Sequence, residues 1–157
     1  MKKAHTYISN SQSETEKLAR RFAHLLRGGE IVFLRGPIGA GKTIFVKSVA
    51  KALGLKSSPT SASFSLMKRY SKGKTVLFHI DLFRLEKEEV FNLGFEEMLE
   101  DENSIILAEW PDPLADMLPV DRLEMDFILC EGDKRKITWS GFGPVSKHLS
   151  EQLCQKK

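Results

Sequence analysis

The segment GPIGAGKT at residues 36–43 constrains the fold of this chain more than any other feature. It matches the pattern G-x-x-x-x-G-K-[ST] at every required position. A short apolar, β-branched run at residues 30–34 leads directly into it and predicts a buried strand. The residues after it predict a helix that ends before Gly54, with inward positions Phe45, Val46, Val49, Ala50 and Leu53. We therefore expect a strand–loop–helix unit with the glycine-rich loop at its centre.

A loop of this composition is suited to binding phosphate. Glycines allow backbone conformations that turn successive N–H groups inward, and the following helix adds the positive end of its dipole. Lys42 supplies a mobile positive charge for the β and γ phosphates, and the Thr43 hydroxyl can ligate magnesium. The sequence therefore predicts binding of ATP with Mg²⁺, and the nucleotide-binding residues expected in the loop are Gly36, Pro37, Ile38, Gly39, Ala40, Gly41, Lys42 and Thr43.

Length and composition indicate one domain over residues 1–157. Hydrophobic residues make up 41% of the chain and charged residues 29%, which is ordinary for a globular protein. No apolar run approaches the roughly 20 residues that cross a bilayer, and the first residues lack the apolar core of a signal peptide. We expect a cytoplasmic protein without a membrane partner. Cys130 and Cys154 lack CxxC spacing, which favours free thiols.

Further elements follow along the chain. Ser13 and Glu16 have capping-box spacing, which predicts an amphipathic helix that ends at Gly28. A polar connector at residues 56–65 has the composition of a functional loop. The remaining expected elements are strands at 75–80 and 104–108, a helical segment at 86–99 broken near Gly94, an antiparallel hairpin from 123–129 and 136–139, a helix at 145–153 and a frayed tail at 154–157.

These elements predict an α/β fold of the P-loop NTPase type. We expect a mixed, mainly parallel central sheet with helices on both faces and a C-terminal antiparallel hairpin. Asp81 and Glu109 each end a predicted apolar strand, so both carboxylates are expected at the sheet edge that carries the P-loop. Either could hold the magnesium shell or orient the attacking water, which makes Lys42, Asp81 and Glu109 the candidate catalytic residues.

The sequence allows more than one role for His79 and for Trp110, which lie close to these acids in the chain. By strand alternation His79 faces the same side as Asp81, although a structural histidine is the favoured interpretation. Trp110 could lie against the nucleotide, form part of a partner surface or be a core residue.

Three blocks of the sequence together resemble the TsaE family, also called YjeE, the bacterial ATPases of tRNA threonylcarbamoyladenosine biosynthesis. The blocks are the P-loop, HIDLFRL at residues 79–85 and AEWPD at residues 108–112. They occur in the family's order and approximate spacing, and the resemblance covers most of the chain. The P-loop alone is generic, whereas the pattern H-x-D-x-[YF]-R-L followed by a strand ending in E-W-P is specific.

The resemblance implies roles for individual residues. Lys42 would bind phosphate, Thr43 and Glu109 would hold magnesium, and Asp81 would support the metal or the attacking water. Trp110 would lie near the nucleotide, and the adenine would approach Ser11 and the hairpin turn at Gly132. A switch loop is expected at residues 56–65. An ungapped register makes Ser63 the favoured hydroxyl that reaches the site, with Thr60 of the literal Ser-Pro-Thr triplet as the alternative.

The resemblance also implies partners: TsaB-like and TsaD-like proteins that modify adenosine 37 of tRNA, with tRNA contact indirect. ATP hydrolysis would act as a switch on the TsaB–TsaD complex. Two alternatives remain, namely a small-molecule or nucleotide kinase with Arg69 or Arg84 over the phosphates, and a nucleotide-gated binding protein without turnover. A GTPase is disfavoured because the chain has no N-K-x-D sequence. Direct tRNA contact through the basic residues 134–136 and Trp139 is a weaker idea, since the net charge is only +3.

Overall fold

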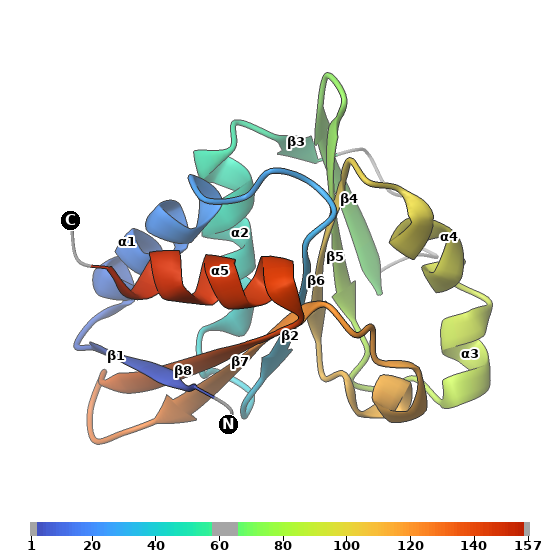
Figure 1. Cartoon of the computed structure of the whole chain (residues 1–157). Helices are drawn as coiled ribbons and strands as arrows, with labels where there is room; N and C mark the ends of the chain where they lie inside the picture. Colours follow the sequence, from blue (N-terminus) through green and yellow to red (C-terminus); the bar gives the residue numbers. More distant parts are fainter. Residues whose placement is uncertain (1–2, 58–65, 156–157) are drawn as a thin grey trace.

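The computed structural model describes residues 3–57 and 66–155, and Figure 1 shows their arrangement. Within this part of the chain, eight strands form one sheet with the order β1-β8-β7-β2-β6-β5-β4-β3. The strands are β1 His5–Ser9, β2 Ile31–Arg35, β3 Lys56–Ser57, β4 Met67–Lys72, β5 Thr75–Asp81, β6 Ser104–Glu109, β7 Arg122–Leu129 and β8 Arg135–Phe142. The helices are α1 Gln12–Ala23, α2 Lys42–Ala52, α3 Lys87–Phe91, α4 Phe95–Glu100 and α5 Pro144–Cys154, with a 3-10 helix η2 at Asp112–Met117.

The centre of the sheet is parallel and both sides are antiparallel. Strands β7, β2, β6 and β5 run in one direction as neighbours. The β1–β8, β8–β7, β5–β4 and β4–β3 pairs are antiparallel. The predicted α/β fold and the β7–β8 hairpin are therefore confirmed, but the prediction of a mainly parallel sheet is wrong. Strands β1, β3 and β4 were not predicted, because strands near a sheet edge need no continuous apolar run.

Central strands are buried on both faces, which explains why they were visible in the sequence. All six residues of β6 are buried, and in β2 only Arg35 is partly exposed. Val32 and Leu34 pack into one hydrophobic cluster, whereas Ile31 and Phe33 pack into a second cluster on the opposite face. Alternate residues of the same strand therefore hold both layers of helices on the sheet.

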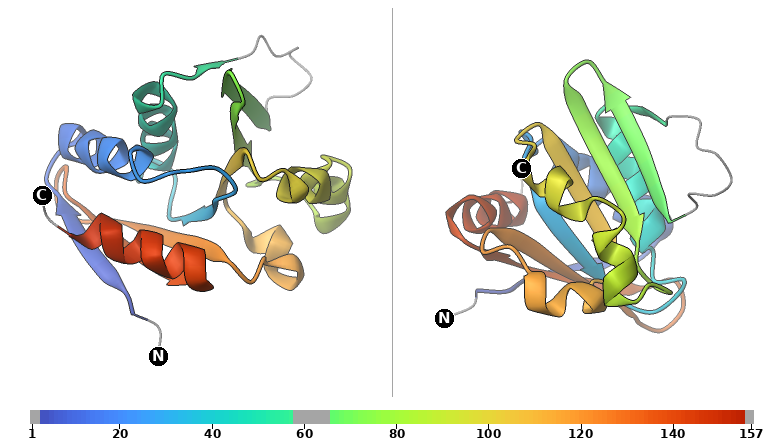
Figure 2. Two further views of the ribbon diagram at one scale, coloured as in Figure 1. Left: turned by 45° about the horizontal axis from the view of Figure 1, so that its top comes forward. Right: turned by 90° about the vertical axis from the view of Figure 1, so that its right-hand side faces the viewer.

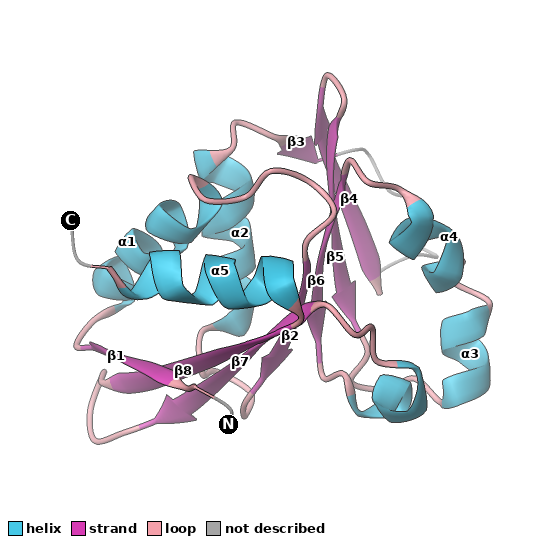
Figure 3. Ribbon diagram, in the orientation of Figure 1, coloured by secondary structure: helices cyan, strands magenta, loops and turns pink. Residues whose placement is uncertain are grey.

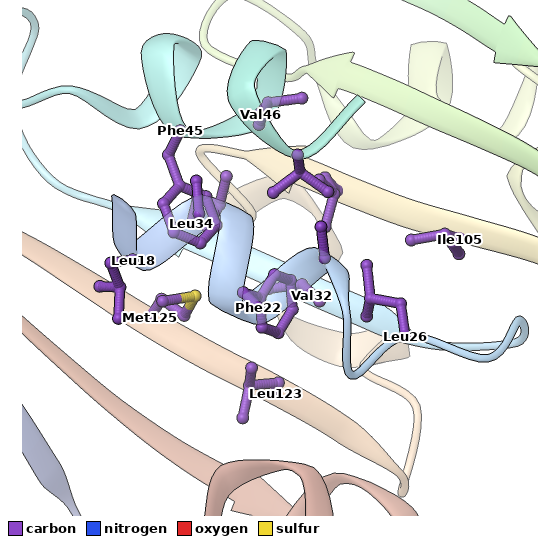
Figure 4. Packing of buried hydrophobic residues seen from close by; sticks show 14 of the residues in the cluster. Leu18, Phe22, Leu26, Val32, Leu34, Phe45, Val46, Ile105, Leu123 and Met125 are labelled. Carbon is purple, nitrogen blue, oxygen red and sulfur yellow. The ribbon is translucent and has the colours of Figure 1, made fainter. Parts of the chain in front are cut away.

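Helices cover both faces, as predicted (Figures 2 and 3). Helices α1, α2 and α5 contribute to the first cluster, and α3, α4 and η2 contribute to the second. In Figure 4, Phe22 of α1 and Phe45 of α2 lie beside Val32 and Leu34 of β2. The rings of Phe22 and Phe45 have centroids 5.6 Å apart, and Phe45 makes an edge contact with Phe127 of β7 at the same centroid distance. This packing fixes α2, and with it the start of that helix, against the sheet.

Glycines end or interrupt two helical segments where the sequence indicated. Gly54 has a φ of 67° just after the C-cap of α2. Gly94 has a φ of 71° and separates α3 from α4, which confirms the predicted break. Cys154 is the last residue of α5, and residues 156–157 lie outside the described part. Both cysteines are free, as predicted, and both are exposed. Among the described residues, no helix has the length and apolarity to cross a membrane.

The N-terminus of α1 differs from the prediction. The cap is Ser11, whose side chain accepts a hydrogen bond from the backbone N–H of Glu14 at 3.2 Å. Ser13 lies inside the helix and is exposed. The capping-box interpretation chose the wrong serine because both are followed by a glutamate at three residues.

Replacing Ser11 by alanine is expected to lower the free energy of unfolding by about 1 kcal/mol, because one helical N–H loses its partner. Ser13→Ala is the matched control and is expected to change stability by no more than a few tenths of a kcal/mol, since alanine favours helix interiors. Urea unfolding of both variants measures the difference. Equal losses in the two variants would contradict Ser11 as the cap.

Candidate nucleotide site

The P-loop sequence joins β2 to α2, at the point where the sequence predicted a strand–loop–helix unit. Gly36, Gly39 and Gly41 have φ values of 138°, 81° and 102°. A Cβ at Gly36 would overlap the main-chain carbonyl of Phe127 in β7, so both its φ and the close approach of β7 require glycine there. Gly41 is the N-cap of α2, which places the loop at the positive end of that helix. The loop therefore has the backbone geometry and the field that favour an anion.

Lys42 is buried in this structure, with 4% of its surface exposed. Its Nζ donates hydrogen bonds to the main-chain oxygens of Gly36 and, at 2.9 Å, of Pro37. The same nitrogen lies 4.3 Å from the ring centroid of Trp110, at cation–π distance. Burial holds the pKa of Lys42 below its ordinary value, and the charges of Glu109 and Asp81 only partly oppose this. The ammonium group is thus held by its own loop and by the indole of Trp110.

Asp81 and Glu109 lie at the same edge of the sheet. Asp81 is the last residue of β5 and Glu109 the last of β6, and the two are partners in the parallel register. Asp81 is partly exposed, and its Oδ1 accepts a hydrogen bond from the backbone N–H of Phe83 at 3.1 Å. Glu109 is only 4% exposed. The sequence therefore placed both acids at the correct edge, and the structure distinguishes them by burial.

Glu109 joins the P-loop to β5. Its Oε1 accepts a hydrogen bond from the Thr43 hydroxyl at 2.8 Å and lies 2.7 Å from Nε2 of His79. Burial raises the pKa of Glu109, but the hydrogen bonds from His79 and Thr43 and the positive charge of Lys42 outweigh it, so the pKa lies below its ordinary value. The carboxylate is therefore ionised at neutral pH.

A pocket of about 380 Å³ opens over these groups. The rings of Phe83 and Trp110 form one wall, with centroids 4.8 Å apart. Trp110 has a φ of 58°, which is rare for a residue with a side chain and turns the chain directly after Glu109. The lining residues are Ile38, Gly39, Gly41, Lys42, Thr43, Ile44, Asp81, Phe83, Arg84, Glu109 and Trp110.

The donor atoms in this pocket fit magnesium. Mg²⁺ prefers oxygen ligands and is commonly held by one or two protein groups together with phosphate oxygens and water. The Thr43 hydroxyl and the Glu109 carboxylate provide such oxygens beside the P-loop, and Asp81 lies at the same edge. Within the described residues no group of three or more His, Cys, Asp or Glu side chains could hold a metal, so a closed protein cage is not present there. The arrangement suits a metal that arrives with a nucleotide.

Several predicted residues lie elsewhere. Ser11 caps α1 and Gly132 lies in the β7–β8 turn with a φ of 63°, and neither lines this pocket. Ser63, the favoured switch-loop hydroxyl, and its alternative Thr60 are outside the described residues.

Two residues at the site were not selected from the sequence. His79 was favoured as structural, yet it contacts Glu109; its alternation with Asp81 was the available signal. Arg135 was considered only among the basic residues 134–136 of the weaker tRNA-contact idea, but its Nε donates to the main-chain oxygen of Ala40 in the P-loop at 3.1 Å. That contact depends on the order of strands in the sheet, which no local pattern encodes.

Fold and site together define the class: a mixed α/β protein with a P-loop sequence at a strand–helix junction and a buried carboxylate at the end of the neighbouring strand. A model of the family described as "Threonylcarbamoyl adenosine biosynthesis protein TsaE" matches residues 9–137. The chain therefore belongs to the TsaE family.

Individual relatives agree with this assignment. A Bacillus subtilis (strain 168) protein named tRNA threonylcarbamoyladenosine biosynthesis protein TsaE is 33% identical over 142 residues, which cover 90% of this chain and 89% of that protein. An Aquifex aeolicus protein of the same name is 37% identical and covers 83% of this chain. The crystal structure of Bacillus subtilis YdiB superposes with a TM-score of 0.81 at 30% identity, covering 98% of this chain and 95% of that one.

Proposed function

We propose that this protein is a Mg²⁺-dependent ATPase that acts as a nucleotide switch in tRNA threonylcarbamoyladenosine biosynthesis in the cytoplasm. One observation carries the chemical part: the Thr43 hydroxyl and the Glu109 carboxylate are 2.8 Å apart beside the P-loop lysine, at the start of a helix. The biological part is supported by membership in the TsaE family. It is also supported by the relatives' names, which place them in this pathway.

Each residue has a role that follows from its position. The N–H groups of the loop and of the first turn of α2 bind the β and γ phosphates, and Lys42 adds its charge once it leaves the carbonyls of Gly36 and Pro37. Thr43 and Glu109 would hold the magnesium, which would supply positive charge to offset that of the phosphates. Asp81, more exposed at the same edge, supports the metal shell or orients the attacking water.

TsaB-like and TsaD-like proteins are the partners in this proposal, and contact with tRNA is indirect. A switch needs two states whose difference a partner can detect. Lys42 provides such a difference, because its nitrogen contacts Gly36, Pro37 and Trp110 before phosphate binds. When Lys42 turns toward phosphate, Trp110 loses its cation–π contact with the ammonium group. Trp110 packs on Phe83, which is 47% exposed and available to a partner.

The test is ATP hydrolysis by the purified protein with magnesium, alone and with TsaB-type and TsaD-type proteins. We expect the partners to stimulate turnover, and Lys42→Ala to reduce it about 100-fold because a phosphate-binding charge is lost. Lys47→Ala, on the exposed side of the same helix, is the matched control and should behave like the unmodified chain.

The other outcomes identify the alternatives. A phosphorylated small molecule or nucleotide as the product would replace the switch with a kinase. Undiminished partner function in a variant that no longer hydrolyses ATP would indicate a nucleotide-gated binding protein instead.

A further inference from the structure

His79 contacts the carboxylate of Glu109 and is not among the residues that line the pocket. It is in the interior of β5, only 7% exposed, and is the register partner of Leu107 in β6. Its Nε2 is 2.7 Å from Oε1 of Glu109, a carboxylate that is itself 4% exposed. Two buried polar groups from neighbouring strands therefore meet at a single short contact.

The contact has a defined direction. A carboxylate can only accept, so the ring nitrogen that faces it carries the proton and donates. The other ring nitrogen, Nδ1, is buried and has no hydrogen-bond partner among the described residues. Glu109 is thus the sole described polar partner of the His79 ring.

Glu109 is held from two sides through one oxygen. Thr43 donates to Oε1 from the start of α2, and His79 donates to the same Oε1 from β5. A hydroxyl that donates its proton to Glu109 keeps lone pairs with which it can ligate a metal. The contact with His79 is the one of the two that comes from the rigid sheet, so it fixes the carboxylate independently of the P-loop.

We propose that His79 is a positioning residue that orients Glu109 for the magnesium of bound ATP. This inference rests on the proposed function and adds a residue to it. Without the Nε2–H donor, the Glu109 carboxylate rotates and loses its alignment with Thr43. Groups that orient a metal-binding side chain typically change metal affinity or activity 10–100-fold when they are removed.

The structure offers a matched pair of substitutions. Glutamine places its amide nitrogen near the position of histidine Nε2, and asparagine places its amide nitrogen near the position of Nδ1. Since only Nε2 has a partner, His79→Gln is expected to retain the function and His79→Asn to lose it. If His79 were needed only for packing, the glutamine variant would have no advantage over the asparagine variant. His79→Leu serves as the apolar comparison.

The experiment measures the Kd for ATP by calorimetry with and without Mg²⁺. The magnesium gain is the ratio of the Kd without Mg²⁺ to the Kd with Mg²⁺. We expect a gain in His79→Gln within about 3-fold of the unmodified chain, and a gain that is lost or about 10-fold smaller in His79→Asn and His79→Leu. The metal-free Kd should be the same in all four proteins. Thermal unfolding checks that each variant is folded.

Two results overturn different claims. An equal magnesium gain in His79→Asn and the unmodified chain would overturn the positioning role alone. Absence of ATP binding by the unmodified chain would overturn the proposed function, and the role of His79 with it.

Discussion

Replacing Glu109 by glutamine is expected to slow ATP hydrolysis about 100-fold or more while ATP binding without Mg²⁺ stays within a few-fold. The amide keeps the size of the side chain and an oxygen that can accept from Thr43, but it removes the charge. That charge is buried, and the protein holds its pKa below the ordinary value through His79, Thr43 and Lys42. The surrounding groups therefore keep this carboxylate ionised. Under the proposed function, its charge acts in the transition state of hydrolysis. Steady-state phosphate release and a separate ATP titration measure the two effects.

A second buried glutamate provides the control. Glu124 in β7 is 8% exposed and forms ion pairs with Arg35 at 3.0 Å and Arg122 at 2.8 Å, outside the pocket. Glu124→Gln is expected to lower stability and to leave hydrolysis per folded molecule unchanged. Loss of hydrolysis in both variants would mean that any buried carboxylate of this sheet is required for the fold, and would remove the specific role of Glu109.

Replacing Gly141 by alanine is expected to cost about 3 kcal/mol of unfolding free energy, the largest stability loss we predict. Gly141 lies in β8 where the first turn of α5 crosses it. A Cβ there would overlap the main-chain carbonyl of Ser146 and approach the backbone nitrogen of Lys147 to 2.5 Å. Backbone atoms cannot move aside as the end of a side chain can, so α5 would have to shift away from the sheet.

Gly73→Ala separates this steric effect from backbone strain. Gly73 has a φ of 60°, and a Cβ there would meet nothing within 4 Å. We expect a cost of about 1 kcal/mol from the left-handed backbone alone. Gly141, by contrast, is not among the glycines with positive φ. Urea unfolding of both variants compares the two costs, and a smaller loss at Gly141 than at Gly73 would show that α5 can move freely on β8.

The predictable part of the fold is the part with the strongest burial pattern. Strands β2, β5 and β6 are apolar runs because helices cover both their faces, and a local pattern suffices to find them. Strands β1 and β4 carry polar, partly exposed residues and are strands only because β8 and β5 pair with them. Their existence depends on partners distant in sequence, so no window of the chain could reveal them.

The residues of the candidate site also fall into those that a local sequence pattern predicts and those that depend on contacts between distant elements. The P-loop is a contiguous motif, and the ends of two apolar strands indicated Asp81 and Glu109 from the sequence alone. His79 required knowing that β5 and β6 are adjacent and in register, because only then does its ring reach Glu109. Arg135 required the full strand order, which brings the β7–β8 turn back to Ala40. Side-chain contacts between distant elements could therefore not be predicted from the sequence, whereas candidate residues within a single motif or strand could.

Under the proposed function, the contacts of Lys42 with the carbonyls of Gly36 and Pro37 make phosphate binding an exchange of hydrogen-bond acceptors around its ammonium group. An incoming phosphate must replace two main-chain oxygens that already accept hydrogen bonds from the ammonium group. The affinity for phosphate therefore depends on the free-energy difference between Lys42 bonded to these carbonyls and Lys42 bonded to phosphate. The same oxygens are available to take the ammonium back when the nucleotide departs. Because neither direction requires a bare buried charge, this loop can load and unload without crossing the high electrostatic barrier that an uncoordinated lysine would impose.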